Sequence, residues 1–255
     1  MEITGCVAIV TGGASGLGEA SVRTLVENGA KVSIFDFAEE RAKGIVSELG
    51  DAVLFCRTDV TDEKTVRSAV EGTIDHFGAI HVAVNCAGGG PPAKVLSRGG
   101  PMPIEDFNQI VQLNLIGTMS VVRLASEKMI KNTPNEHGEK GVIINTASVA
   151  AFDGQVGQAA YSAAKGGIVS MTLPIARKFA DYGIRVVTIA PGLFETPGLA
   201  VLSEKVKDGL RKAIPFPNRF GNPVEFALLV RNIIENPMLN GTTIRLDGAL
   251  RMAGR

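Results

Sequence analysis

A tyrosine, a lysine and a serine near the middle of the chain have the types and spacing of a proton-transfer group. Tyr161 and Lys165 lie four residues apart, and Ser148 lies thirteen residues before the tyrosine. On a helix, positions i and i+4 share one face, so the phenol and the ammonium can interact. A nearby cation favours phenolate, so we expect Lys165 to lower the Tyr161 pKa from its ordinary value of about 10. Such a tyrosine can exchange a proton with a substrate oxygen, although the same spacing also occurs on solvated helix faces.

A glycine-rich turn near the N-terminus indicates a dinucleotide site. Residues 6–10 form a short apolar run that predicts a buried strand, and a helical pattern follows the turn and ends at Asn28-Gly29. Glycine lets the backbone approach a pyrophosphate, and the helix N-terminus supplies free N–H groups. Any tight turn favours glycine, so the flanking strand and helix are what make this motif informative. The positions that we predict to contact the cofactor here are Gly12, Ser15, Gly16, Leu17 and Gly18.

The predicted second strand, residues 31–35, ends in an acid that bears on the choice of cofactor. Asp36 lies twenty residues after Gly16, where a carboxylate can accept hydrogen bonds from the adenosine ribose hydroxyls. A carboxylate there repels a 2′-phosphate, whereas NADP sites place Arg or Lys nearby, and both Ala14 and Phe37 are uncharged. The sequence therefore predicts NAD as the cofactor, unless Asp36 is only a turn residue at the strand end.

Further motifs complete a pattern that resembles a known family. Asn85-Cys86-Ala87-Gly88, Asn114 and Pro191-Gly192 accompany the glycine turn and the Ser148, Tyr161 and Lys165 group. In order and spacing these motifs resemble the short-chain dehydrogenase/reductase family over essentially the whole chain, with Asn-Cys-Ala-Gly in place of the usual Asn-Asn-Ala-Gly. Residues 141–152, 154–161, 190–194 and 239–249 also resemble the family's type II 3-hydroxyacyl-CoA dehydrogenase branch, whose members oxidise hydroxysteroids as well.

The resemblance implies a role for each of these residues. Tyr161 would be the general acid and base, Lys165 would also hold the nicotinamide ribose, Ser148 would orient the substrate oxygen, and Asn114 would support a proton relay. Asp59 would contact adenine and Thr196 the carboxamide, although either could be a capping or turn residue. The cofactor contacts implied outside the glycine turn and Asp36 are Asp59, Val60, Asn85, Ala87, Gly88, Tyr161, Lys165, Pro191, Gly192 and Thr196.

Strand and helix patterns alternate along the whole chain. Alternation of this kind predicts an α/β fold, a single Rossmann-type doubly wound parallel sheet with helices on both faces. There is no linker, repeat or low-complexity tract, so we expect one domain over residues 1–255. The later strands are expected at 52–56, 82–85, 142–145, 185–189 and 243–246, and helices at 39–49, 63–77, 105–131, 204–213 and 224–235, besides the helix that carries Tyr161.

The composition is typical of an ordinary globular enzyme. The 255 residues have zero formal charge and no run of Lys and Arg, so we expect neither nucleic acid nor membrane as a partner. Three cysteines without paired spacing predict reduced thiols: Cys6, Cys56 and Cys86. Three scattered histidines predict no metal site: His76, His81 and His137. With no signal peptide and no apolar stretch of about twenty residues, we expect a cytoplasmic protein, with mitochondria as the alternative.

Two segments interrupt the alternation and are expected to border the substrate. Residues 88–103 and 192–217 follow strand ends, where ligands of such sheets bind. Apolar residues in the second segment, among them Leu193 and Leu199, would suit a fatty acyl chain or a steroid. Cations in these segments either meet the phosphates of coenzyme A or are only solvated: Lys94, Arg98, Lys205, Lys207, Arg211 and Lys212.

Three functions are compatible with these features. The favoured one is an NAD-dependent dehydrogenase of 3-hydroxyacyl-CoA that would also accept hydroxysteroids. We expect it to assemble as a homotetramer through helices apolar on more than one face, near 105–131 and 158–181. An NADPH-dependent 3-oxoacyl reductase of fatty-acid or polyester synthesis has the same fold, but Asp36 argues against it. A non-catalytic NAD-binding subunit would have no need for Ser148, Tyr161, Lys165 and Asn114.

Overall fold

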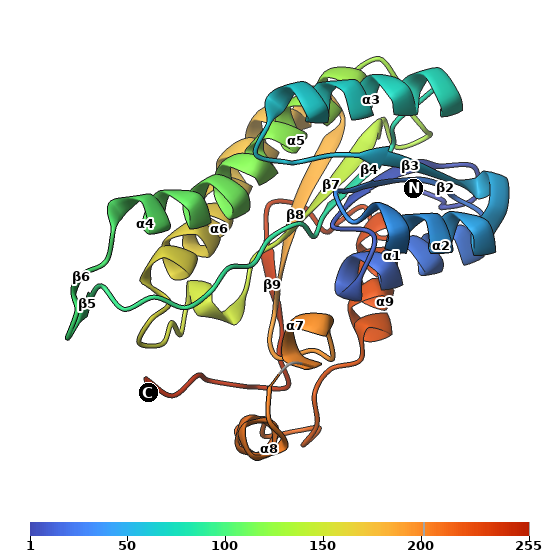
Figure 1. Cartoon of the computed structure of the whole chain (residues 1–255). Helices are drawn as coiled ribbons and strands as arrows, with labels where there is room; N and C mark the ends of the chain where they lie inside the picture. The colour runs from blue at the N-terminus through green and yellow to red at the C-terminus, as the bar shows by residue number, and fades with distance from the viewer. Residues whose placement is uncertain (201, 255) are drawn as a thin grey trace.

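The computed structural model describes residues 1–200 and 202–254, so Val201 and Arg255 lie outside the described residues. Seven parallel strands form one sheet in the order β3-β2-β1-β4-β7-β8-β9 (Figure 1). From β1 the chain adds β2 and β3 on one side, and from β4 it adds β7, β8 and β9 on the opposite side. This reversal of strand order confirms the doubly wound parallel sheet. The strands are β1 (Val7–Thr11), β2 (Lys31–Asp36), β3 (Val53–Arg57), β4 (Val82–Asn85), β7 (Gly141–Thr146), β8 (Ile184–Pro191) and β9 (Thr243–Leu246).

Helices cover both faces of the sheet. Successive strand residues point to opposite faces, so Val10 packs in one core and its neighbour Ile9 in the other. Both faces exclude water, which explains why these strands are almost continuously apolar. The first face is covered by α1 (Gly16–Glu27), α2 (Glu39–Leu49) and α9 (Pro223–Glu235), and the second by α3 (Glu63–Phe77), α5 (Gly117–Met129) and α6 (Ala159–Ala180).

The carboxyl ends of the strands meet at one edge of the sheet. The register pairs Thr11 of β1 with Phe35 of β2 on one side and with Asn85 of β4 on the other. Asn85 in turn pairs with Asn145 of β7. The segments that follow these strands, each with its sequence motif, are therefore brought side by side although they are far apart in the chain.

The long helix expected at 105–131 is interrupted. The chain forms α4 (Ile104–Val111), then a π-helical turn (Gln112–Ile116), and only then α5. Asn114 lies in the π turn, where its side-chain amide donates to the Ile110 carbonyl at 2.9 Å and so binds an acceptor one turn back. Single π turns of this kind often occur at functional sites.

The two irregular segments contain short elements, of which the sequence analysis expected only the helix at 204–213. Residues 88–103 hold a small antiparallel hairpin, β5 (Leu96–Ser97) and β6 (Gly100–Pro101). Residues 192–217 hold α7 (Pro197–Ala200) and α8 (Glu204–Lys212), which project beyond the sheet near the C-terminal tail (Figure 1). The remaining elements are two 3-10 turns, Gly50–Ala52 and Val149–Ala151. Within the described part of the chain, no helix has the length and apolar character needed to cross a membrane.

Candidate active site

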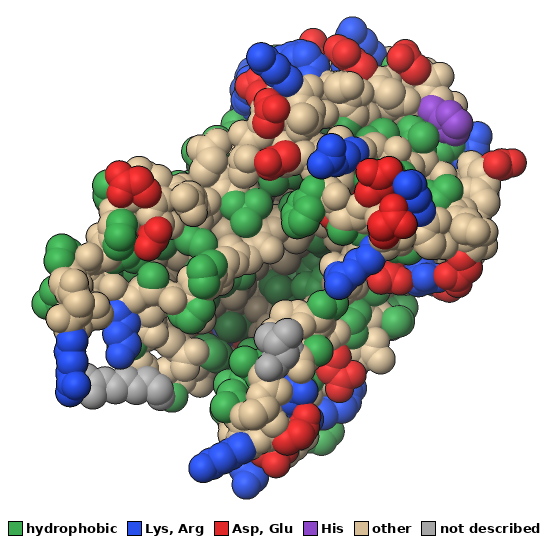
Figure 2. Space-filling view, in the orientation of Figure 1, with side chains coloured by type: hydrophobic (Ala, Val, Ile, Leu, Met, Phe, Trp, Pro, Cys, Tyr) green, Lys and Arg blue, Asp and Glu red, His purple; other side chains and the backbone are tan. Residues whose placement is uncertain are grey.

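A cleft of about 1060 Å³ opens at the carboxyl edge of the sheet. Figure 2 shows the molecule hollowed beside α7, with apolar side chains on the floor of the hollow. The cleft gathers segments from six strand ends. The predicted residues that line it are Gly12, Ser15, Gly16, Leu17, Gly18, Asp36, Asp59, Val60, Ala87, Gly88, Ser148, Tyr161, Lys165, Pro191, Gly192 and Thr196.

The turn between β1 and α1 accepts only glycine at two of its positions, and its backbone can therefore come close to a dinucleotide pyrophosphate in the cleft. A Cβ atom at Gly12 would lie 2.9 Å from the Ala87 nitrogen, and one at Gly18 would lie 2.1 Å from the Gly12 carbonyl oxygen. Gly16 has a φ of +54°, which favours glycine. The Ser15 hydroxyl does not cap α1, so the first N–H groups of the helix are free to bind an anion. The turn therefore fits a dinucleotide.

The adenosine end of the cleft is organised by Asp36. Its two carboxylate oxygens accept hydrogen bonds from the backbone N–H groups of Ala14 at 3.0 Å and Ala38 at 2.9 Å. Phe37, which is 75% exposed, and Arg41 line the same cleft. The sequence analysis, which found no basic residue for this position, did not consider Arg41. Arg41 is the third residue of α2, and its place in the first turn of the helix that follows Asp36 was the signal that could have revealed it.

Ser148, Tyr161 and Lys165 meet on the other side of the cleft. Ser148 follows β7, and its hydroxyl accepts a hydrogen bond from the Ala150 nitrogen at 3.1 Å, which fixes the start of the 3-10 turn. Tyr161 and Lys165 lie on the first turns of α6. The Lys165 ammonium nitrogen donates to the Thr146 carbonyl at 2.8 Å and lies 5.6 Å from the centroid of the Tyr161 ring.

Burial controls the titration of this group. Desolvation raises the pKa of Tyr161, and the side-chain hydrogen bond with Ser148 opposes the rise. Desolvation also lowers the pKa of Lys165 to about 8, while the neighbouring Cys86 thiol acts in the opposite direction. The expectation that Lys165 lowers the Tyr161 pKa was therefore wrong for this structure, because burial of the phenolate raises the pKa and the opposing effect comes from Ser148.

Asn85 and Asn114, two other predicted site residues, lie outside the cleft wall. Asn85 is 2% exposed and its side chain donates to the Asn145 side-chain oxygen at 2.9 Å, so it joins β4 to β7. The Asn114 side chain accepts from the Gly89 nitrogen at 2.9 Å and donates to the Gly89 carbonyl at 2.8 Å. A Cβ at Gly88 would lie 2.6 Å from the Asn114 oxygen and 3.2 Å from the Lys165 nitrogen, so Asn114 supports the loop beside Lys165.

Asp59 and Thr196 both line the cleft, and each also has a local role. The Asp59 carboxylate accepts from the Thr61 backbone nitrogen at 2.9 Å and from the Thr61 hydroxyl at 2.7 Å, which makes Asp59 a turn residue as well. The Thr196 methyl group is 3.3 Å from where a Cβ of Gly16 would be, so the segment before α7 touches the glycine turn.

Cys86 is a cleft residue that the sequence analysis did not assign to the site. The Thr146 hydroxyl donates to its sulfur at 3.6 Å, and burial raises the pKa of the thiol to about 11. Cys86 is therefore a neutral thiol beside Lys165. The signal was its place in Asn-Cys-Ala-Gly, where the family usually has asparagine. All three cysteines are free.

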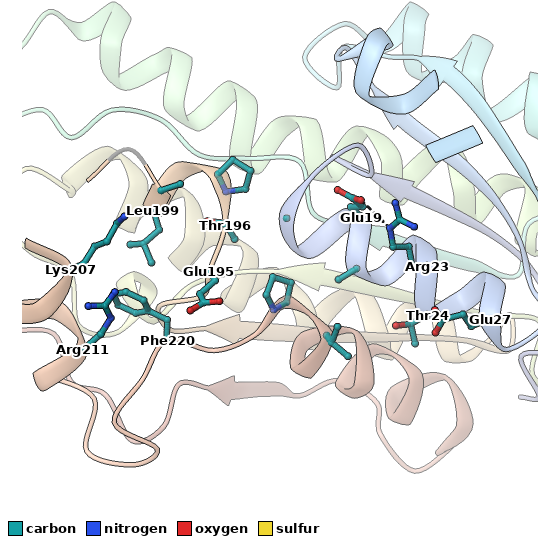
Figure 3. A pocket seen from close by; sticks show the side chains of 16 residues that line it. Glu19, Arg23, Thr24, Glu27, Glu195, Thr196, Leu199, Lys207, Arg211 and Phe220 are labelled. Carbon is teal, nitrogen blue, oxygen red and sulfur yellow. Dashed lines mark hydrogen bonds and ion pairs between the residues drawn. The ribbon is translucent and has the colours of Figure 1, made fainter. Parts of the chain in front are cut away.

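The cations considered for coenzyme A lie in different places. Lys207 and Arg211 line a second cavity, of about 810 Å³, between α8 and the outer side of α1 (Figure 3). Lys207 binds Glu204 at 3.0 Å, and Arg211 binds Asp208 and stacks on the Phe220 ring, with 5.0 Å to the centroid. Lys94 instead lines a groove beside the start of α6, together with Ser162.

The fold and the cleft define a nicotinamide-dependent oxidoreductase. A sequence model of the family described as short chain dehydrogenase matches residues 6–207. The chain is 53% identical over 253 residues to the human 3-hydroxyacyl-CoA dehydrogenase type-2, covering 98% of this chain and 97% of that protein. The chain belongs to the short-chain dehydrogenase family, and it interconverts a secondary alcohol and a ketone with a nicotinamide cofactor.

Solved structures agree with this assignment. The 3-hydroxyacyl-CoA dehydrogenase type-2 from Mycobacterium avium is 41% identical and superposes with a TM-score of 0.95, covering 98% of each chain. The 3-ketoacyl-(acyl-carrier-protein) reductase from Brucella melitensis, complexed with NADH, is 30% identical with a TM-score of 0.87, covering 98% of this chain and 100% of that one.

Proposed function

We propose that this protein is an NAD-dependent 3-hydroxyacyl-CoA dehydrogenase. The observation that carries the proposal is the meeting of Ser148, Tyr161 and Lys165 in the cleft that also holds the glycine turn. The substrate class is supported by the relatives of that name, which are similar to this chain over nearly its full length.

In the oxidation direction, Tyr161 accepts the proton of the substrate hydroxyl. Ser148 donates a hydrogen bond to the same oxygen and stabilises the charge that develops on it. Bound NAD supplies the hydride acceptor. Because burial raises the Tyr161 pKa, the phenol is the resting form, which suits proton donation in the reduction direction. Lys165 holds the nicotinamide ribose, and Asn114, behind the Gly88 loop, supports the path by which the proton leaves.

The preference for NAD is supported by the acid at the end of β2. Asp36 lies at the adenosine end of the cleft, where its carboxylate can accept hydrogen bonds from ribose hydroxyls and repels a 2′-phosphate. Arg41 favours the second candidate, an NADPH-dependent 3-oxoacyl reductase, because a guanidinium at this end could bind that phosphate. We favour NAD because Asp36 is held directly by two backbone N–H groups in the cleft, whereas Arg41 is exposed on α2.

An acyl chain would find apolar surface next to Ser148. Val149 packs in an apolar cluster with Leu193, Leu199 and Met252, which come from the segment after β8 and from the C-terminal tail. Lys94 is the cation that we favour for a coenzyme A phosphate, because it lines a groove beside α6 and forms no ion pair with the described residues. A steroid would use the same apolar surface.

We also propose a single domain, a homotetramer and a cytoplasmic location. Ile116 beside α5 and Leu173 on α6 are exposed apolar side chains, as expected if these helices pair between subunits. The free cysteines suit a reducing compartment. A stable monomer in sedimentation would contradict the tetramer.

The test is NADH consumption by the purified protein with acetoacetyl-CoA. Tyr161→Phe should lower kcat by about 10²-fold to 10⁴-fold while NADH still binds, because only the proton donor is lost. Tyr182→Phe is the matched control, since Tyr182 is 42% exposed at the end of α6 and should leave the rate unchanged. Faster turnover with NADPH would favour the reductase, and equal loss in both variants would contradict the role of Tyr161.

A further inference from the structure

Arg245, on the edge strand β9, joins two carboxylates from distant parts of the chain. Its Nη2 atom lies 2.6 Å from an Asp153 oxygen, and its Nε atom lies 2.7 Å from an Asp247 oxygen. Nη2 also donates to the Leu250 carbonyl at 2.9 Å. The guanidinium carbon is 5.1 Å from the centroid of the Phe152 ring. All these contacts are held by one side chain that is only 21% exposed.

The first carboxylate belongs to the turn that carries Ser148. Ser148 begins the 3-10 turn Val149–Ala151, and the Asp153 nitrogen closes the turn by donating to the Val149 carbonyl at 2.8 Å. Phe152 and Asp153 therefore form the far end of a very short segment whose other end is the Ser148 hydroxyl. A tether at Asp153 limits the positions that Ser148 can take.

The second carboxylate belongs to the wall at the Gly192 side of the cleft. A Cβ at Gly192 would lie 2.9 Å from the Asp247 Cα, so the two backbones are in contact. The Gly192 nitrogen also donates to the Leu246 carbonyl at 2.9 Å. Asp247 is thus tied to the segment that follows β8 and leads to Thr196.

We propose that Arg245 is a positioning residue for the reaction. By binding Asp153 and Asp247 together, it holds the Ser148 turn at a fixed distance from the Gly192 turn, and so sets where the substrate oxygen lies relative to the cofactor. The planar guanidinium offers donors in several directions at fixed angles, which a lysine ammonium does not reproduce. This inference rests on the proposed role of Ser148.

A double-mutant cycle with Ser148 tests the proposal in the full-length protein. Arg245→Met should lower kcat with acetoacetyl-CoA by about 10-fold to 10²-fold, because a misplacement of about 1 Å can have an effect of that size. The KM for NADH should change little. In a Ser148→Ala background, the same substitution should lower kcat by no more than about 2-fold, since the group that it positions is already absent.

Three more variants separate positioning from folding. Arg251→Met is the matched control. The Arg251 guanidinium lies 3.3 Å from Asp247 and 4.0 Å from Asp153, but its side chain is 61% exposed, so its removal should leave kcat unchanged. Arg245→Lys should recover part of the lost kcat. Asp153→Asn removes the tether at the Ser148 turn alone, and it should reproduce most of the loss even if Arg245→Met does not fold.

The outcomes distinguish this proposal from the one on which it rests. If Ser148→Ala leaves kcat unchanged, the role of Ser148 fails. If Ser148→Ala is damaging but Arg245→Met lowers kcat by the same factor in both backgrounds, Arg245 acts only on general stability and the positioning role fails. An unchanged kcat in Asp153→Asn would also overturn the proposal that Asp153 tethers the Ser148 turn to Arg245.

Discussion

Replacing Lys165 by methionine should make the protein more stable at neutral pH while abolishing its activity. Lys165 is buried, and desolvation lowers its pKa from 10.5 to about 8. Each tenfold change in proton affinity corresponds to about 1.4 kcal/mol, so the protonated side chain destabilises the folded state by about 3 kcal/mol at pH 7. Methionine removes this penalty but also removes the hydrogen bond to the Thr146 carbonyl. The loss of that bond cancels about 1 kcal/mol or more of the gain in stability.

The pH dependence isolates the charge from the lost hydrogen bond. The unfolded chain keeps the Lys165 proton up to about pH 10.5, and the folded chain keeps it only up to about pH 8. Between these values the unfolded state binds more protons, so wild-type stability rises with pH relative to Lys165→Met. The advantage of the variant should shrink by about 2 to 3 kcal/mol between pH 7 and pH 10.

Urea denaturation followed by circular dichroism measures this difference at each pH. Lys178→Met is the control, because Lys178 is an exposed lysine on the same helix and its removal should produce no comparable change with pH. A stability difference between wild type and Lys165→Met that stays constant from pH 7 to pH 10 would refute the argument from burial. The activity of Lys165→Met should be lost at every pH, which would separate the effect of Lys165 on protein stability from its role in the reaction.

Three further predictions concern the cleft. Alcohol oxidation should speed up as pH rises from 6 toward the raised pKa of Tyr161, because the phenolate is the base that accepts the proton. Initial rates of oxidation that fall over this range would contradict the role of Tyr161 as the base. Gly18→Ala should abolish NADH binding measured by fluorescence, since its Cβ would lie 2.1 Å from the Gly12 carbonyl oxygen; unchanged affinity would show that the turn can move. Asp36→Ala should raise kcat/KM for NADPH by about 10-fold or more, because it frees two N–H groups and removes a repulsive charge in the cleft that Arg41 also lines. An unchanged NADPH preference would rule out Arg41 as a phosphate ligand.

Local patterns in the sequence were sufficient to predict most of the fold. The strands at 82–85 and 243–246 and the helices at 39–49 and 63–77 were predicted with the observed bounds. Each depends on interactions between residues a few positions apart, or on the apolar runs that burial on both faces requires. The prediction of one continuous α-helix over 105–131 was wrong at residues 112–116, which form a π turn. There the Asn114 side chain binds the Ile110 and Gly89 carbonyls, and Gly89 is distant in sequence.

By itself, the sequence determined that a glycine turn follows the first strand, that an acid ends the second, and that Tyr161 and Lys165 share a helix face. The tertiary structure alone decided that Asn85 joins two strands instead of lining the cleft, that Arg41 lines the same cleft as Asp36, and that Arg245 connects Asp153 to Asp247. It also reversed the expected direction of the Tyr161 pKa. The physical reason is that spacing fixes which groups are neighbours on one element, whereas burial and long-range pairing are set by every segment that surrounds a group in the folded chain.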